Sequence, residues 1–285
     1  MEKKRRFTKL KDMWTRLRRN KLAVIGLIII ALIIIMAIFA DFIAPYSYDE
    51  QDLMNCFQLP SAAHFFGTDE FGRDIFSRVV FGARISLLIG FVAVAIAMVI
   101  GVLLGAFSGY YGDKVDNIIM RLMDILLSIP QIILAIAIVA VLGNGLFNLM
   151  LAVGISSIPH YARIVRASVL SVKDQEFIEA ARAAGSSDLR IIFKHIIPNC
   201  LAPIIVQATL GVALAILTAA GLSFVGLGIS PPTPEWGSML SSARSYIRDY
   251  PYMAMFPGLA IMVTIFALNV LGDGLRDALD PKQKR

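Results

Sequence analysis

Long uncharged, apolar stretches alternate with short charged ones along the chain. Five runs contain no Lys, Arg, Asp or Glu: residues 22–40, 85–112, 125–159, 199–234 and 250–272. A helix rises about 1.5 Å per residue, so about 20 apolar residues cross the hydrocarbon core of a bilayer. Each run is therefore long enough for one transmembrane helix. The third is long enough for two, divided at the turn-like Gly143-Asn144-Gly145.

The pattern predicts an all-α integral membrane protein, a polytopic bundle of about six transmembrane helices. The expected spans lie near residues 22–43, 85–107, 124–142, 146–160, 200–228 and 253–272. The fourth is the shortest, and Pro159 marks its end. A transmembrane β-barrel would instead show segments of about ten residues with alternating polarity, which this sequence lacks.

The basic residues are distributed unequally between the segments that connect these spans. Lys and Arg number ten in residues 1–21, two in 108–122, six in 160–198 and four in 274–285, but only three in 44–84 and two in 229–252. Six spans therefore place 22 basic residues on one side of the membrane and five on the other. Because cytoplasmic loops carry the excess of Lys and Arg, both termini are predicted to be cytosolic.

Composition excludes several classes of function. The chain is 57% hydrophobic and 17% charged, whereas soluble domains contain about 45–50% and about 25%. Topology accounts for the net charge of +6, so we predict no nucleic-acid partner. The sequence has no P-loop and no catalytic constellation, and it therefore predicts neither ATP binding nor enzymatic activity. The histidines and cysteines, His64, His160, His195, Cys56 and Cys200, lack metal-ligand spacing.

The middle of each predicted span is free of ionisable residues. Transporters driven by protons or ions commonly hold such residues within the membrane as relays. A transporter without them takes its energy from elsewhere, and a cytosolic segment is the place where a partner could act.

The longest cytosolic loop, 160–198, predicts two short helices joined by a tight turn. The signals are Asp174 as the N-cap of a helix over 175–184, Gly185 as its left-handed C′ residue, and Ser186-Ser187-Asp188 as the N-cap of a helix over 188–197. Outside the membrane, Phe76, Val79, Val80 and Ala83 fall at helical spacing and predict a short surface helix. The run 231–234, which contains three prolines, predicts a rigid loop after the fifth span.

The cytosolic loop resembles the EAA loop of bacterial ABC-importer permeases. The matching residues are Glu179, Ala180, Ala181, Gly185 and Pro198. The family pattern has Ile and Leu before the proline, where this sequence has His195 and Ile197. The resemblance implies that these helices dock on an ATPase subunit, and that the chain has the fold of this class of permease, the MetI-like fold.

Further segments resemble the second permease subunit of dipeptide/oligopeptide/nickel importers. They are Gly67-Thr68-Asp69-Glu70-Phe71-Gly72-Arg73-Asp74, Gly82-Ala83-Arg84, Pro231-Pro232-Thr233-Pro234-Glu235-Trp236-Gly237 and the terminal run 272–281. The likeness covers essentially the whole chain. It implies a non-catalytic transmembrane subunit that lies in the lipid of a bacterial cell membrane, with a second homologous permease, two ABC ATPase subunits and an extracytoplasmic substrate-binding protein as partners. ATP and Mg would be bound by the ATPases, and no cofactor by this chain.

Hydropathy, charge and the resemblance together divide the chain into five parts: a cytosolic basic tail (1–21), a first transmembrane helix (22–43), an extracytoplasmic segment (44–84), a permease transmembrane domain (85–273) that includes the EAA loop (160–198), and a cytosolic tail (274–285). Two other classes stay open: a self-sufficient channel or secondary carrier, and a membrane anchor without a transport role. The cargo also stays open between a dipeptide, a longer peptide, nickel and another small solute.

Overall fold

The computed structural model describes residues 14–279. The regular elements of this part of the chain are all helices, and a single isolated β-bridge joins Thr68 and Asp74. The elements are α2 (Lys21–Ile38), α3 (Ala40–Ile43), η1 (Leu53–Asn55), α4 (Ile75–Tyr111), α5 (Asp113–Leu127), α6 (Gln131–Leu142), α7 (Leu146–Leu170), α8 (Glu176–Ala183), α9 (Asp188–Ile191), η2 (Ile192–Ile196), η3 (Ile197–Asn199), α10 (Leu201–Phe224), α11 (Trp236–Ala243), η4 (Arg244–Tyr246) and α12 (Tyr252–Leu279). The predicted all-α bundle is confirmed.

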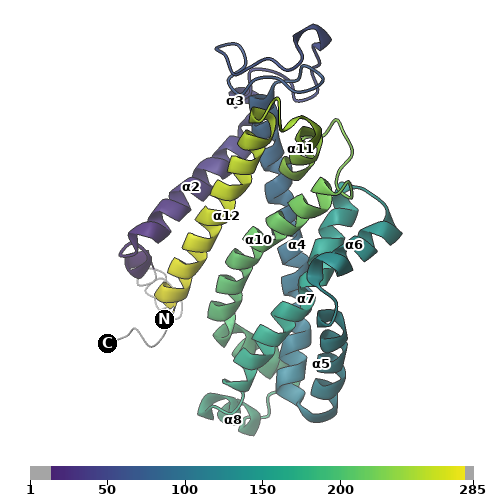
Figure 1. Ribbon diagram of the computed structural model, residues 1–285. Helices are drawn as coiled ribbons and strands as arrows, with labels where there is room; N and C mark the ends of the chain where they lie inside the picture. The colour runs from purple at the N-terminus through teal and green to yellow at the C-terminus, as the bar shows by residue number, and fades with distance from the viewer. Residues whose placement is uncertain (1–13, 280–285) are drawn as a thin grey trace.

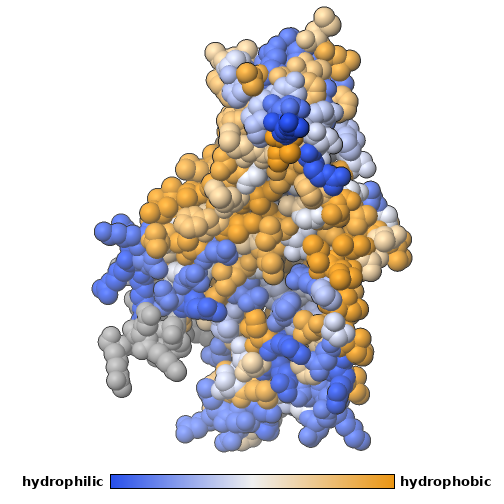
Figure 2. Space-filling view, viewed as in Figure 1, coloured by the Kyte–Doolittle hydropathy of each residue, from blue (hydrophilic) through white to orange (hydrophobic). Residues whose placement is uncertain are grey.

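Four of these helices, α2, α4, α10 and α12, are long and apolar enough to cross a membrane, and the bent pair α5 and α6 makes a fifth candidate. Figure 1 shows α2 and α12 side by side, with α10 next to α12, α4 behind α10 and α7 alongside. On the face that Figure 2 shows, apolar side chains form a broad band across the middle, and polar ones gather at the lower end, where α8 lies. This distribution fits a protein that crosses a bilayer.

Following the predicted topology, we call the end of the molecule that bears α8 the inner end and the opposite end the outer end. The first helix after the segment 44–74, α4, is a single helix of 37 residues. Asp74 caps its start, because its carboxylate accepts a hydrogen bond from the Ser77 amide at 2.7 Å. The prediction of a separate surface helix near residue 76 and a span that starts at 85 is therefore wrong. Nothing in 75–85 breaks a helix, so the outer amphipathic turns and the span form one continuous rod that runs the length of the molecule (Figure 1).

The predicted third span, 124–142, is not one straight helix. α5 and α6 are bent by 87° relative to each other. The break falls at Ser128-Ile129-Pro130, where Pro130 has no amide hydrogen to donate and disfavours the helical conformation of the residue before it. Hydropathy did not reveal the bend, because apolar residues continue through it.

The fourth predicted span is longer than expected. α7 runs over 25 residues to Leu170 and contains Pro159 in its interior. It falls outside the set of helices that are apolar enough to span a membrane by themselves. Its first half nevertheless belongs to the core of the bundle, where Leu149 and Val153 are fully buried.

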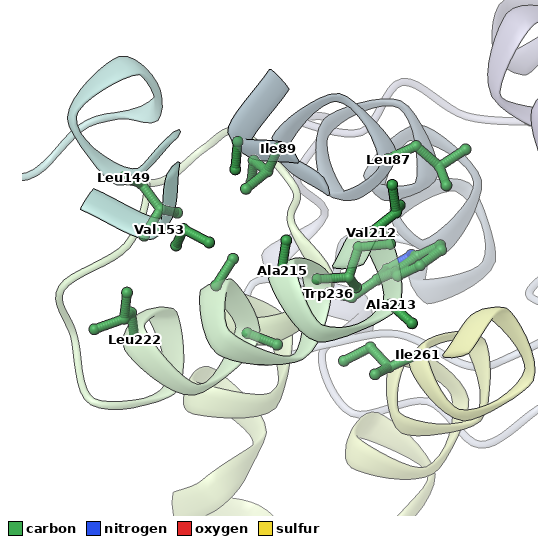
Figure 3. Close-up of a cluster of buried hydrophobic side chains, with 14 of the residues drawn as sticks. Leu87, Ile89, Leu149, Val153, Val212, Ala213, Ala215, Leu222, Trp236 and Ile261 are labelled. Carbon is green, nitrogen blue, oxygen red and sulfur yellow. The ribbon is translucent and has the colours of Figure 1, made fainter. Parts of the chain in front are cut away.

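The core lies where five helices converge. In Figure 3, side chains from α4, α7, α10, α11 and α12 point toward one another, with Trp236 of α11 among them. α4 and α7 approach closely because Gly101, Gly105 and Gly109 face α7: a β-carbon on Gly105 would clash with the Ala162 carbonyl oxygen, and one on Gly109 would lie 2.8 Å from the Val169 β-carbon. The small residues allow the two helices to pack backbone to backbone.

Candidate functional site

The loop between α7 and α10 contains two helical segments, as predicted, although their details differ. The first helix, α8, starts after Gln175, which makes no side-chain cap, so the assignment of Asp174 as N-cap is wrong. Ser187 is the N-cap of the second segment but also makes no side-chain cap hydrogen bond. That segment is not one helix over 188–197: it passes from α9 into a π-helix, η2, and a 3₁₀ turn, η3.

Gly185 closes α8 in the left-handed conformation that the sequence predicted. Its φ is +78°, and the region around a β-carbon there is empty to 4 Å. The Gly185 amide donates to the Arg182 carbonyl at 3.0 Å, and the Ser186 amide donates to the Ala181 carbonyl at 3.1 Å. These two hydrogen bonds form a Schellman motif. The turn is therefore ordered, and it faces open space.

The loop rests on a small apolar core of its own. Ile178 of α8 and three isoleucines of the second segment, Ile191, Ile192 and Ile196, are fully buried against Val165 and Val169 of α7 and Ala106 of α4. This packing fixes the loop on the inner ends of the two helices that pack most closely together.

The EAA residues divide between the loop surface and its base. Glu179 and Ala180 are exposed, Ala181 is half-buried, and Gly185 is exposed at the turn. α8 and its turn thus bring these four together. Pro198 is exposed in η3, at the far end of the second segment, just before α10. Three large apolar side chains of the loop are exposed as well: Phe177 by 38%, Leu189 by 56% and Phe193 by 50%.

A polar contact ties the turn to the inner end of α4, and sequence reasoning missed it. The Tyr110 hydroxyl donates a hydrogen bond to a carboxylate oxygen of Asp188 at 2.7 Å. The Arg182 guanidinium lies 5.9 Å from the centre of the Tyr110 ring, within cation–π range. The spacing of 78 residues between Tyr110 and Asp188 leaves no signal in a single sequence.

A second polar contact joins the helices beneath the loop. The Arg166 guanidinium of α7 pairs with both carboxylate oxygens of Asp116 on α5, each at 2.5 Å. Ser108 of α4 donates to the same carboxylate. Bidentate pairs of this kind hold the two side chains in a defined geometry and also contribute energy. The inner ends of α4, α5 and α7 are thereby held as one unit.

At the outer end, the segment 67–74 folds into a buried, charged turn. Asp69 accepts hydrogen bonds from the backbone amides of Phe71 and Arg73 and pairs with the Arg73 side chain at 2.7 Å. Arg78 of α4 lies 3.6 Å from the same carboxylate, and its guanidinium donates to the Tyr48 and Pro232 carbonyls. Asp69, Arg73 and Arg78 are all at least 94% buried. The turn is an ion-pair network that ties three outer segments together.

The second outer motif anchors α11. Glu235 is buried, and its carboxylate accepts hydrogen bonds from the Gly237 and Ser238 amides, each at 2.8 Å, so it caps the helix. Burial raises the pKa of this carboxyl. The Trp236 indole donates to the Val79 carbonyl at 3.0 Å and packs on Gly82, where a β-carbon would lie 3.0 Å away. The proline run precedes α11 as the loop that was predicted, whereas α11 itself was not.

The chain belongs to the family of binding-protein-dependent transport system inner membrane components, which matches residues 101–285. Residues 8–60 match the N-terminal transmembrane domain of oligopeptide transport permease C. The family identifies the chain as an ABC-importer permease, a non-catalytic membrane subunit of a larger importer.

Curated relatives are similar over almost the whole chain. A dipeptide transport system permease protein from Alkalihalophilus pseudofirmus is 53% identical, over 96% of this chain and 90% of the relative. A di/tripeptide transport system permease protein from Pseudomonas aeruginosa is 48% identical, over 96% and 93%. A glutathione transport system permease protein from Escherichia coli is 50% identical, over 96% and 90%.

Solved structures show the same fold. A chain of the MetNI methionine ABC transporter in an inward-facing conformation aligns with a TM-score of 0.59 at 22% identity, covering 71% of this chain and 96% of that one. A chain of an amino acid ABC transporter solved with histidines aligns with a TM-score of 0.55 at 17% identity, covering 70% and 94%. The predicted MetI-like permease fold is confirmed. Within residues 14–279, no group of three or more metal-ligating side chains is assembled.

Proposed function

We propose that this permease imports peptides, and that together with a second, homologous permease it forms their translocation path. The relatives that are about half identical over nearly the whole chain carry dipeptide, di/tripeptide or glutathione transport names. All three cargo names describe short peptides or a peptide-like compound, and this shared chemistry favours a peptide over nickel as the cargo.

The proposed complex contains two ABC ATPases and an extracytoplasmic binding protein that delivers the peptide. ATP and Mg bind to the ATPases, and no cofactor binds to this chain. Both termini and the 160–198 loop lie in the cytosol. The charge asymmetry supports this orientation, and so does the position of the beginning of α2 and the end of α12 toward the lower, α8-bearing end of the molecule (Figure 1).

One observation supports docking through the α8 turn: the loop is ordered, yet the EAA residues around Gly185 are exposed and have open space beside them. The Schellman turn at Gly185 has no neighbour within 4 Å of a β-carbon, and Glu179 and Ala180 are exposed beside it. The exposed Phe177, Leu189 and Phe193 add apolar surface to the same loop. Exposed apolar side chains on an ordered element are typical of a protein–protein interface. ATP-driven closure of the ATPases would move this loop, and the loop would move α4 and α7.

The experiment compares Gly185→Val with Gly143→Val. Both glycines have a positive φ, +78° and +85°, and open surroundings, but Gly143 lies in the turn between α6 and α7. Either valine strains the backbone by about 1 kcal/mol or more. Gly185→Val is expected to reach the membrane normally while losing co-purification of the ATPase subunits and peptide uptake. Glu179→Lys is expected to weaken the same contact.

Gly143→Val reports the cost of strain without docking, and it is expected to retain ATPase binding. The measurements are membrane abundance by immunoblot, ATPase subunits recovered with the tagged permease, and uptake of a labelled dipeptide. Full ATPase recovery with Gly185→Val would overturn the docking role. Full recovery of the complex with no peptide uptake by the wild type would overturn the peptide assignment and leave the docking role intact.

A further inference from the structure

A polar cavity of about 220 Å³ lies at the outer end of α10. Its walls come from segments far apart in the sequence: the outer turn with Arg73, the start of α4 with Arg78, the loop after α10 with Ser230, and α11 with Ser242. Nothing in the coupling role of the α8 turn uses it. In the proposed orientation it lies at the extracytoplasmic end, where a substrate arriving from outside would first meet the permease.

The charge that lines this cavity is positive. Arg73 and Arg78 are its charged lining residues in the part of the chain that the structure describes. Their acidic partners, Asp69 and Glu70, do not line it; they line a smaller neighbouring space of about 20 Å³, which shares Arg73, Arg78 and Ser242 with the larger one. Burial raises the pKa of the Glu70 carboxyl, and its Oε2 atom makes no hydrogen bond. With its nearer carboxylate oxygen 3.7 Å from Arg73, Glu70 is a weaker partner of that guanidinium than Asp69, which pairs with it at 2.7 Å.

Both arginines retain capacity for another acceptor. Arg73 directs its Nε to Asp69, and its closest approach to Glu70 is a long 3.7 Å. Arg78 donates two hydrogen bonds from one terminal nitrogen, to backbone carbonyls. A guanidinium has five N–H donors in a planar fork that matches a carboxylate. Since both side chains are at least 94% buried, water screens their charge poorly.

The opposite wall supplies hydroxyl groups. Ser238 and Ser241 donate their hydroxyl hydrogens to the backbone carbonyls of Glu235 and Phe224. Ser230, Thr233 and Ser242 also line the cavity, and their hydroxyls make no hydrogen bond within the described chain. Phe71 adds an apolar wall, with the Arg73 guanidinium 4.6 Å from its ring centre. Whole small-molecule sites occupy about 300–1,000 Å³, so this cavity suits one end of a ligand.

We propose that the cavity binds the carboxylate-bearing end of the incoming substrate, between the Arg73 and Arg78 guanidinium groups and the hydroxyls of α11. This site rests on the proposed function as a peptide permease, and it assigns that substrate a free carboxylate. A C-terminally amidated peptide loses the charge that the arginines recognise. Inorganic phosphate is also an anion, but it lacks the peptide chain that would make further contacts with the permease.

The test uses the purified permease–ATPase complex without its binding protein, so that the binding protein cannot select the ligand. The probe is a tripeptide that carries a photo-activatable diazirine residue, either as the free acid or as the C-terminal amide. Labelled sites are mapped by mass spectrometry. The free acid is expected to label residues 226–242 about tenfold more than the amide, as befits a hydrogen bond to a charged group. An excess of inorganic phosphate is expected not to abolish this labelling.

Ser242→Glu and Ser242→Gln form the matched pair of variants. Ser242 is exposed, so either side chain can be accommodated without disrupting the buried ion pairs. The two side chains are nearly equal in size, but only the glutamate places a negative charge near the arginines. It is expected to remove the preference for the free acid, whereas the glutamine is expected to retain it.

Equal labelling by acid and amide, equal preference in the two variants, complete competition by phosphate, or no labelling of this region would each overturn the site. Dipeptide uptake by the full complex with its binding protein is measured in parallel. Uptake without the labelling preference rejects the site alone. The labelling preference without uptake keeps the site and rejects the proposed peptide import.

Discussion

The recognisable motifs at the two ends of this permease differ in burial. At the outer end, Asp69, Arg73 and Asp74 are 94% or more buried and form hydrogen bonds within the chain. At the inner end, Glu179 and Gly185 are exposed beside open space. The contrast shows that two motifs can be equally easy to recognise in a sequence and yet differ in whether their residues contact the rest of the chain. The outer motif folds the chain onto itself, whereas the inner motif makes few contacts within the chain and is the one that we propose docks on an ATPase.

The largest expected effect comes from breaking the outer network. Asp69→Asn leaves the Arg73 and Arg78 guanidinium groups buried without a full counter-charge, and breaking such a buried pair costs about 3–5 kcal/mol. We expect a strong fall in membrane abundance and in the melting temperature in detergent. The matched control is Asp41→Asn, which removes the partner of Arg84 from an ion pair in which Asp41 is 63% exposed. A stable, abundant Asp69→Asn protein would show that the outer end is not held by this network.

A smaller loss of stability is expected at the contact between α4 and α7, the helices that connect the two ends. Gly105→Ala forces a methyl group against the Ala162 carbonyl oxygen of α7, and such overpacking costs about 1–3 kcal/mol. Gly221→Ala is its control, since a β-carbon there would lie 3.6 Å from Ile132 in ordinary contact. Thermal melts of both variants in detergent measure the difference. Equal melting temperatures would contradict the backbone-level contact between α4 and α7.

At the inner end, Tyr110→Phe removes one hydroxyl and the hydrogen bond to Asp188, worth about 1 kcal/mol. The exposed docking surface is unchanged, so we expect the ATPases to co-purify normally. The ratio of peptide transported to ATP hydrolysed should fall, because the turn is tied less firmly to α4. Tyr111→Phe is the neighbouring control. An unchanged ratio in Tyr110→Phe would show that the tether does not transmit movement.

The smallest effect concerns pH. Burial raises the pKa of Glu70 above its ordinary value, so the folded state disfavours the charged form. The resulting cost to stability is present at neutral pH and disappears as the pH falls below the ordinary pKa of 4.5. Glu70→Gln is expected to raise the melting temperature slightly at pH 7 and not at pH 4. A destabilised variant at pH 7 would mean that the ion pair with Arg73 outweighs burial.

The sequence predicted what depends on local chemistry and composition. Hydropathy identified the apolar helices, and Gly185 was identified because few residues other than glycine favour a left-handed C′ position. Prediction from the sequence failed where the deciding contact joins residues far apart along the chain, and where the structure changes without a change in polarity. The bend before Pro130 lies within a continuous apolar run, and the first turns of α4 differ from its span in polarity but not in helical propensity. The Tyr110 contact and the outer cavity depend on residues that only the fold brings together.

The uninterrupted length of α4 has a mechanical consequence. Its 37 residues measure about 55 Å, against about 30 Å for the hydrocarbon core of a membrane. Arg78 near one end joins the outer network, and Tyr110 near the other holds the α8 turn. A stiff rod that tilts about a pivot inside the membrane displaces its two ends in opposite directions. A push on the inner end would therefore swing the outer turn the other way, and one side would open as the other closes without any signal passing from residue to residue.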